Sequence, residues 1–475
     1  MSTITATLRE AGRTPAADMH VSLTADTPLV IRQWLRILPE KRLVGCGDWN
    51  GRQVLAKLFI ATGAERHWQR EKAGIEALQQ ASIATPALLA SGELAGGGRY
   101  LLTEYLSGSH SLQQLWEQLP DPLPNSPEAL ASLQRALHTI AAMHAQGLTQ
   151  ADLHLGNFLQ DGQQLYVIDG DAIEAPLPGT SVGLKTVQNN LGLFFAQLTP
   201  QWDSQVEYLL QSYLSCNPMP GLESQHLLAA VAAQRQIRMD NFLDKTLRDC
   251  SQFAVATSGH RFGVVLRSEQ QALAPLLADP DSAFGGLPLL KDGGSSTVTR
   301  ATVAGREVVI KRYNIKGFGH WLTRFWRPSR AWHSWLAAWR LQFLGIATPQ
   351  PLAMIERRIG PCRRQAWLIT EYCRGPNLLQ QLGESGATIP DSQTADALRQ
   401  AFTQVVNARI SHGDFKATNL LWQDGKVVLI DLDAMQAHSS DAEWHKAWGK
   451  DRARFIRNWP ADSALAQWLE AEMPR

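Results

Sequence analysis

Hydrophobic and polar positions change between two periods along this chain, and the same order of periods occurs in each half. In the first half, apolar residues alternate as in strands, recur at helical spacing, and then repeat both patterns. These segments predict strands, a helix, a strand and a helix at residues 36–57, 65–80, 100–105 and 128–145. A mostly helical stretch follows over residues 186–245. The pattern predicts a small sheet with one helix, followed by a larger helical part.

The second half repeats this order. It predicts a strand ending at Lys311, followed by a helix, a strand and a helix at residues 329–343, 367–372 and 393–409. Residues 253–267 predict an additional pair of strands, so we place a domain boundary near residue 246. We therefore expect an α+β chain of two tandem domains, residues 1–245 and 246–475. Each domain should have a small, mainly antiparallel sheet lobe and a helical lobe.

Composition narrows the possible classes of protein. Of the 475 residues, 44% are hydrophobic and 19% are charged, so both halves are long enough to bury a core. A net charge of +1 argues against a nucleic-acid binder. The five Cys are scattered and form no C-x-x-C pair, which favours a reducing compartment. We identify no signal peptide and no apolar run of about 18 residues, so we expect a cytoplasmic protein.

One pattern of polar residues occurs twice. In each copy an Asp is followed five residues later by an Asn and, after twelve more, by an Asp that closes an apolar run. The first copy holds Asp152, Asn157 and Asp169, and the second holds Asp414, Asn419 and Asp431. Equivalent positions are 262 residues apart each time (414 minus 152, 419 minus 157, 431 minus 169). A constant offset across three such residues indicates a duplicated domain.

Protein kinases use this spacing for the catalytic Asp and two metal-binding residues. Asp152 and Asp414 would orient an acceptor hydroxyl, while the Asn and second Asp of each copy would hold Mg²⁺ through hard oxygen ligands. Lys57 and Lys311 end β-branched strands 95 and 103 residues earlier, where a kinase lysine binds the phosphates of ATP. Any one of these residues alone is more often a turn, cap or surface residue. The complete, duplicated set favours phosphoryl transfer.

The two copies differ in their surrounding residues. The second has a candidate phosphate loop before Lys311, made of Gly293, Gly294, Ser295, Ser296 and Thr297. The same offset before Lys57 falls on residues 39–41, Pro-Glu-Lys, which cannot form a glycine loop. Conversely, Glu71 is a candidate partner for Lys57, whereas the matching position in the second copy is Ser334. We favour the second copy as the active site and leave open whether the first also turns over.

Two further segments suggest binding surfaces. The strands that end at Glu104 and at Glu371–Cys373 correspond to the segment whose backbone usually receives adenine, although ordinary buried strands have similar sequences. Residues 308–355 contain no acidic residue and are rich in Arg and Trp. Within them Trp332, Trp335, Leu336, Trp339 and Phe343 share a helical stripe that we expect to pack on the sheet. Residues 316–330 are either a solvated loop or a surface for anionic lipid or phosphosugar.

The chain resembles the lipopolysaccharide core kinases, which phosphorylate Kdo or heptose and are distantly related to protein kinases. The residues that carry the resemblance are 152–159, 311–316, 345–349, 412–414, 429–433 and 454–459. The resemblance implies bilobal protein-kinase-like domains that use ATP and Mg²⁺. It also implies a lipopolysaccharide core or lipid-linked sugar acceptor at the inner-membrane surface, and association with other core-assembly enzymes.

Three functions remain open at this point. The leading hypothesis is an ATP-dependent kinase for a heptose or Kdo hydroxyl of the inner core, at the cytoplasmic face of the inner membrane. The alternatives are a non-catalytic tandem pseudokinase that organises core assembly, and a kinase for a small soluble substrate. ATP turnover separates the first two, and a soluble substrate would leave the Arg- and Trp-rich segment without a membrane role.

Overall fold

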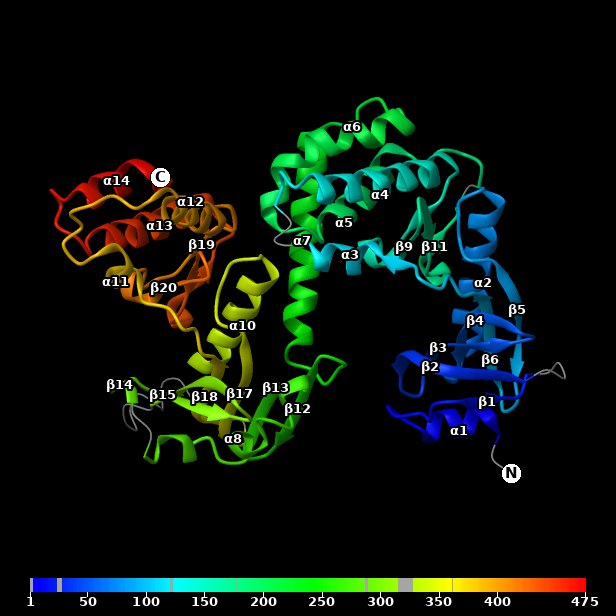
Figure 1. Cartoon of the computed structure of the whole chain (residues 1–475), viewed down its shortest axis with the longest axis horizontal. Helices are drawn as coiled ribbons and strands as arrows, with labels where there is room; N and C mark the ends of the chain where they lie inside the picture. The colour runs from blue at the N-terminus through cyan, green and yellow to red at the C-terminus, as the bar shows by residue number, and fades with distance from the viewer. Residues whose placement is uncertain are drawn as a thin grey trace. The chain divides into compact units, whose positions relative to one another are not determined.

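The structure is a computed structural model that describes residues 3–23, 28–119, 123–176, 178–286, 289–314, 328–360 and 362–475. The chain divides into two compact units, Met1–Arg235 and Gln236–Arg475. In Figure 1 the first unit runs from blue to green and the second from green to red. Helix α7 (Ser224–Lys245) contributes Leu227 and Val231 to a core of the first unit, and Met239 and Leu243 to the core of the second.

The first unit begins with a six-stranded antiparallel sheet in the order β1-β2-β3-β4-β6-β5. Its elements are α1 (Ile4–Glu10), β1 (Met19–Val21), β2 (Leu29–Leu38), β3 (Arg42–Trp49), β4 (Arg52–Phe59), α2 (Ala64–Gln80), β5 (Leu88–Leu94) and β6 (Gly98–Glu104). Side chains alternate along β4, where Val54, Ala56 and Leu58 are buried in one core. A second, smaller cluster joins Phe59 to Ile75 of α2.

The rest of the first unit is mainly helical. It contains β7 (His110–Ser111), α3 (Leu112–Gln118), α4 (Pro127–Ala145), β8 (Thr149–Gln150), β9 (Phe158–Asp161), β10 (Gln164–Val167), β11 (Ile173–Glu174), α5 (Leu184–Phe195) and α6 (Val206–Cys216). Helix α4 begins at Pro127 because Ser126 caps it and proline suits the first helical position. Its buried face includes Leu133, Leu137 and His144, as the periodicity predicts.

The second unit begins with a seven-stranded antiparallel sheet in the order β12-β13-β17-β18-β16-β15-β14. Its elements are β12 (Phe253–Ser258), β13 (Arg261–Leu266), α8 (Ala274–Ala278), β14 (Leu289–Gly293), β15 (Ser296–Val303), β16 (Arg306–Tyr313), α10 (Arg330–Phe343), β17 (Pro351–Ile359) and β18 (Cys362–Glu371). The additional strand pair predicted from the sequence forms the β12-β13 edge of this sheet.

Helix α10 packs on this sheet through its aromatic stripe. Trp335 and Trp339 are buried, and their rings lie 6.1 and 5.1 Å from that of Phe253. Trp332 lies 5.0 Å from Phe262. The predicted packing of the stripe is therefore confirmed. Of the segment 316–330, residues 316–327 lie outside the described residues.

The remainder of the second unit is again mainly helical. It contains α11 (Leu378–Leu382), α12 (Ser392–Asn407), β19 (Ile410–Ser411), β20 (Leu420–Gln423), β21 (Lys426–Leu429), β22 (Gln436–Ala437), α13 (Asp441–Ile456) and α14 (Ala464–Glu472). Each unit thus has the predicted α+β architecture, with an antiparallel sheet lobe and a helical lobe. Within the part of the chain that the structure describes, no helix is long and apolar enough to cross a bilayer.

Candidate active site

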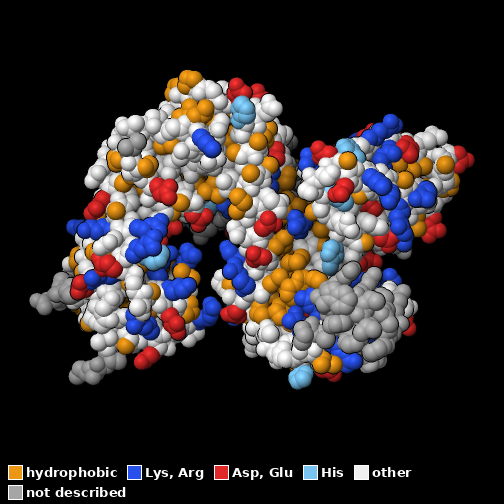
Figure 2. Space-filling model, turned by 180° about the vertical axis from the view of Figure 1, so that it is seen from behind, with side chains coloured by type: hydrophobic (Ala, Val, Ile, Leu, Met, Phe, Trp, Pro, Cys, Tyr) orange, Lys and Arg blue, Asp and Glu red, His pale blue; other side chains and the backbone are white. Residues whose placement is uncertain are grey.

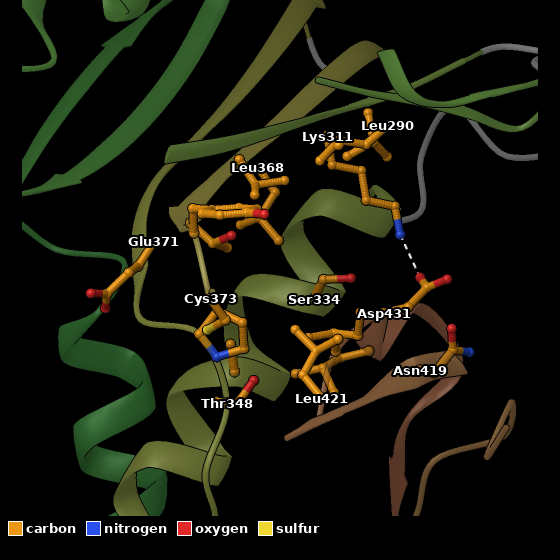
Figure 3. A pocket seen from close by; sticks show the side chains of 18 of the residues that line it. Leu290, Lys311, Ser334, Thr348, Leu368, Glu371, Cys373, Asn419, Leu421 and Asp431 are labelled. Carbon is orange, nitrogen blue, oxygen red and sulfur yellow. Dashed lines mark hydrogen bonds and ion pairs between the residues drawn. The ribbon is translucent and has the colours of Figure 1, made fainter. Parts of the chain in front are cut away.

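A cavity of about 550 Å³ lies in the second unit, and five of the predicted site residues line it: Lys311, Glu371, Cys373, Asn419 and Asp431. Figure 3 shows Lys311 reaching down from the sheet toward Asp431, with Asn419 beside it on the helical lobe. The Lys311 ammonium lies 2.5 Å from Asp431 Oδ1. Three residues predicted from spacing alone are therefore brought together by the fold.

Lys311 has a second carboxylate partner that sequence reasoning did not identify. Asp433 Oδ2 lies 2.8 Å from its ammonium. The other oxygen of Asp433 accepts hydrogen bonds from the hydroxyls of Ser334, at 2.9 Å, and Tyr313, at 2.8 Å. Burial and the neighbouring Asp433 charge raise the pKa of Tyr313 well above its usual value, so its hydroxyl remains a donor. Ser334, at the position where the sequence lacks a glutamate, thus fixes the aspartate that pairs with the lysine.

Asp431 is held as an anion by this arrangement. Its burial opposes ionisation, but the charge and hydrogen bond of Lys311 outweigh that effect, so the pKa of Asp431 lies below its usual value. Lys291 of β14 lies 4.0 Å from its other oxygen. The backbone of Asp431 is left-handed, with φ 60°, as is that of Asp169 in the first unit, with φ 69°. Both copies therefore place this aspartate with the same unusual backbone conformation.

Asp414 is surrounded by donors. Arg454 of α13 lies 2.7 Å and Lys416 lies 3.1 Å from its Oδ1 atom. The amide of Asn419 donates to its Oδ2 atom at 3.1 Å and to its backbone carbonyl at 2.9 Å. With its NH₂ group directed at Asp414, Asn419 has its amide oxygen free to bind a cation. Sequence reasoning named Asp414 and Asn419, but did not identify the two cations that hold the carboxylate.

Buried polar groups fix the loop that carries Asp414. The ring of His412 contacts the carbonyl of Ile430 at 2.8 Å. Asp451 of α13 accepts hydrogen bonds from the amide of His412 at 2.6 Å and from that of Gly413 at 3.1 Å. Burial lowers the pKa of His412 and raises that of Asp451. The catalytic loop is therefore attached both to the Asp431 segment and to α13.

The candidate phosphate loop forms the turn between β14 and β15. Gly293 pairs with Ser296 at the end of this hairpin, and Gly294 and Ser295 form its tip. Asn314 secures the turn, because its side chain donates to Gly293 O and Thr297 Oγ1, each at 3.1 Å. The cavity itself is lined by Leu290, Lys291 and Val298 from the same hairpin, and not by residues 293–297.

The predicted adenine segment lies on the far side of the cavity. Cys373 lines it, and burial raises the pKa of its thiol to about 11. Within the described ranges, no group accepts a hydrogen bond from the amide of Cys373. Figure 3 shows the carboxylate of Glu371 directed away from the cavity, and Arg306 lies 3.5 Å from it. In the first unit Glu104 is exposed at the end of β6.

The first unit arranges its lysine differently. Lys57 is paired with the buried Glu71 of α2 and lies 3.6 Å from Asp169. Glu71 also accepts hydrogen bonds from the amides of Gly170, at 3.1 Å, and Asp171, at 3.3 Å. The contact between Lys57 and Glu71 expected from the sequence is present. Asp171, the equivalent of Asp433, instead lies 3.3 Å from Arg70 and 3.2 Å from His67.

Asp152 lacks the support that Asp414 receives. Its side chain is 68% exposed, compared with 30% for Asp414. His154 lies 3.8 Å away, and no Lys or Arg of the described chain lies within 4 Å. Asn157 donates only to the backbone carbonyl of Asp152, at 2.7 Å. Asn190 of α5 bonds to this loop through Gln150 O, at 2.8 Å. The residues 39–41 form the β2–β3 turn, where the second unit has its glycines.

The donor set of the second unit is suited to magnesium. Mg²⁺ bound to a nucleotide needs only one or two protein oxygens, because phosphates and water supply the rest. The carboxylate of Asp431 and the amide oxygen of Asn419 are such ligands, and both residues line the cavity. In the described ranges no three His, Cys, Asp or Glu cluster as a protein-only metal site. Asn157 and Asp169 are the corresponding pair in the first unit.

Comparisons with known proteins agree with this geometry. A family model described as "Lipopolysaccharide kinase (Kdo/WaaP) family" matches residues 54–180 and 291–459. Both lysines and both Asp-Asn-Asp series lie within these regions. A search of curated proteins found no match.

Several solved structures are similar to part of this chain, all at low identity and low TM-score. WaaP in complex with acyl carrier protein is 18% identical, covers 43% of this chain and 88% of its own, and has a TM-score of 0.33. The bifunctional kinase-methyltransferase WbdD is 22% identical, with coverages of 46% and 49% and a TM-score of 0.31. The PknI kinase domain of Mycobacterium tuberculosis is 14% identical, with coverages of 46% and 99% and a TM-score of 0.31.

Proposed function

Because the chain belongs to the lipopolysaccharide kinase (Kdo/WaaP) family and is a phosphotransferase, we propose that its second unit phosphorylates a heptose or Kdo hydroxyl of the lipopolysaccharide inner core. The observation that carries the assignment to this unit is the environment of Asp414. Arg454, Lys416 and Asn419 hold its carboxylate beside the cavity that contains Lys311 and Asp431. The corresponding carboxylate of the first unit, Asp152, is exposed and has no such support.

ATP binds in the cavity with its adenine against Leu368 and Leu421 and its phosphates toward Lys311. The backbone amide of Cys373, which has no acceptor within the described ranges, donates a hydrogen bond to the adenine base. The nucleotide then lies along the length of the cavity. Lys311 binds the phosphates and is oriented by Asp431 and Asp433. Lys291 adds a second cation at the same end. The hairpin that ends at residues 293–296 covers this part of the site.

Asp431 and Asn419 would hold a magnesium ion, which would supply positive charge to neutralise the transferred phosphoryl group. Asp414 accepts a hydrogen bond from the acceptor hydroxyl and orients its oxygen toward the γ-phosphate. Arg454 and Lys416 hold the carboxylate of Asp414 in one orientation. Asn419 would join the two roles, because its NH₂ group donates to Asp414 while its amide oxygen would be a ligand for the metal.

The first unit acts as a non-catalytic companion in this proposal. It retains the pair between Lys57 and Glu71, together with Asp169, so a nucleotide has phosphate- and metal-binding groups. It has the residues 39–41 in place of a glycine turn, and Asp152 without a cationic partner. We assign the acceptor chemistry to the second unit for these reasons, and place the enzyme at the inner-membrane surface, where its lipid-linked acceptor is made.

The test combines a strain lacking the protein with the purified enzyme. Mass spectrometry of core oligosaccharide from the deletion strain should show the loss of one phosphate, about 80 Da in mass, from the inner core. The purified protein with ATP and Mg²⁺ should restore that mass on the extracted lipopolysaccharide. An unchanged phosphate content in the deletion strain, together with no transfer in vitro, would refute the proposal. ATP consumption with a small soluble alcohol in place of lipopolysaccharide would favour the alternative substrate class.

A further inference from the structure

A second cavity, of about 580 Å³, lies in the helical lobe of the second unit beside the catalytic loop. It is lined on one side by Ser411 and Gly413, which flank His412 in the sequence just before Asp414. On the other side it is lined by one face of α13, including Lys446, Lys450 and Arg454. None of the predicted site residues lines it. Its function is therefore not explained by nucleotide binding.

The three cations are spaced four residues apart, so they form a single row along α13. All three are exposed, and like charges at this spacing repel one another and destabilise a helix. Within the described parts of the chain, Lys446 and Lys450 have no carboxylate within 4 Å, and Arg454 pairs only with Asp414. Figure 2 shows several Lys and Arg side chains on the face that it draws of this lobe. Two lysines of the row, Lys446 and Lys450, thus have no carboxylate partner among the described residues, and an anionic ligand would stabilise them.

The acidic residues of this cavity do not neutralise the row. Asp451 directs its carboxylate to the amides of His412 and Gly413 and is buried. Glu443 is exposed, lies at the start of the helix and has no cation of the described chain within 4 Å. His438 contacts the hydroxyl of Ser411 at 2.7 Å. Three cations thus face one exposed carboxylate.

Arg454 links the row to the reacting groups, because its guanidinium lies 2.7 Å from Asp414 Oδ1. Lys450 is one helical turn, about 6 Å along the axis, from Arg454, so an anion bound by Lys450 lies near the carboxylate of Asp414. We propose that this cavity binds an anionic group of the sugar acceptor, either the carboxylate of a sugar acid or a phosphate already present on the core. The site would select acceptors that carry a negative charge next to the hydroxyl to be phosphorylated. This inference rests on the proposed function and deepens it.

The experiment compares the double variant Lys446→Ala/Lys450→Ala with a control, Lys245→Ala/Lys426→Ala, which removes two exposed lysines of the same unit outside both cavities. Each protein is assayed with three forms of the core acceptor: untreated, with carboxylates methyl-esterified, and with phosphates removed enzymatically. On untreated acceptor we expect kcat/KM of the first variant to fall about tenfold through KM, the effect of one charge-assisted hydrogen bond. The control should stay within about twofold of wild type.

One of the two treatments should neutralise or remove the anion that occupies the cavity. That treatment should lower kcat/KM of wild type by a similar factor and leave kcat/KM of the variant unchanged. The treatment that has this effect identifies the ligand as carboxylate or phosphate. The inference would be overturned if kcat/KM of the variant were lower than that of wild type by the same factor on all three acceptors, or if it were not lower on any of them. If wild type phosphorylates no form, the proposed function fails. Binding of free Kdo and of inorganic phosphate, followed by NMR, then tests the cavity, and equal binding by wild type and variant would refute it.

Discussion

Both units hold a lysine beside the aspartate that ends the Asp-Asn-Asp series, but they use different residues to do so. In the first unit Glu71 of α2 holds Lys57, and the same carboxylate binds the amides of Gly170 and Asp171. In the second, Asp433 holds Lys311 and comes from the segment that follows Asp431. The carboxylate that pairs with the lysine thus comes from helix α2 in the first unit and from the loop after Asp431 in the second. Loss of the glutamate at position 334 is therefore compensated and does not by itself indicate an inactive copy.

The loops that carry Asp152 and Asp414 also differ, and here the second unit has the more extensive contacts. Asp414 is held by two cations, while Asp152 is exposed and lies near a histidine only. The first unit thus has the usual pair of a lysine and a glutamate, but its Asp152 carboxylate has fewer supporting contacts than Asp414. Judged by the lysine partner alone, the first unit would have been chosen as active. Our assignment of activity to the second unit therefore rests on the contacts of the Asp414 carboxylate and not on the partner of the lysine.

The largest effect is expected from Asp414→Asn. Replacing this carboxylate by an amide removes the acceptor for the hydroxyl proton with almost no change in volume, so phosphoryl transfer should fall roughly a thousandfold. Asp152→Asn should change the rate by less than about twofold, since that carboxylate is exposed. Initial rates at matched ATP and Mg²⁺, with melting curves for both variants, make the comparison. A dead Asp152→Asn enzyme would reverse the assignment of the two units.

A smaller effect is expected when the lysine partner is removed. Asp433→Ala leaves Lys311 with Asp431 alone and deprives Ser334 and Tyr313 of their acceptor, so kcat/KM for ATP should fall about 10- to 100-fold. Glu71→Ala in the first unit should leave kcat/KM unchanged while lowering that unit's stability. Steady-state kinetics with ATP as the varied substrate measure both. A large loss of rate in Glu71→Ala would mean that the first unit contributes to turnover.

Membrane association should depend on the acid-free window of the second unit. Residues 308–355 carry no acidic residue, whereas the stretch after Lys57 contains Glu65, Glu71, Glu76 and Glu93. Charge reversal at Arg324 and Arg327 should weaken binding to anionic vesicles by roughly tenfold or more, at about 1 kcal/mol per cation near the surface. Arg330 is left unchanged because it contacts Ser295 and Asp433.

Co-sedimentation at low and high salt measures this binding, with Arg36→Glu/Arg66→Glu, two exposed arginines of the first unit, as the matched reversal. Wild-type binding should weaken at high salt. Wild type that does not bind vesicles at low salt, or binding insensitive to the reversal at residues 324 and 327, would contradict the prediction.

The smallest effect concerns the pH dependence of stability. Burial lowers the pKa of His144 in the first unit to about 4, whereas the position 262 residues later is Val406. A histidine whose folded pKa lies below its unfolded value stabilises the fold above pH 6.5, and this contribution is lost as the pH falls toward 4. Between pH 6.5 and 5 the first unit should lose about 1–2 kcal/mol through His144. Urea unfolding of His144→Gln should show a flatter profile over that range.

The sequence predicted the fold well where local pattern and duplication coincide. The strand pair at 253–267, the aromatic stripe of α10 and the buried face of α4 all follow from periodicity. Lys311, Asn419 and Asp431 were brought to one cavity as spacing suggested. Asp433 was visible two residues after Asp431, but its role depends on Ser334 and Tyr313, which are about 100 residues away in sequence. Arg454 and the α13 row likewise require the packing of a distant helix on the catalytic loop.

The approach of α2 to the Asp169 segment has a consequence for the history of the duplicated gene. Gly74 and Gly170 allow two backbones to meet, since a Cβ at Gly74 would lie 2.0 Å from Gly170 O, and one at Gly170 would lie 2.3 Å from Glu71 O. The second copy has Leu432 at the position of Gly170. Recombination between the halves would transfer that leucine into a space without room for any side chain. We therefore expect transfer of the second copy's sequence into the first to disrupt the packing of α2 on the Asp169 segment.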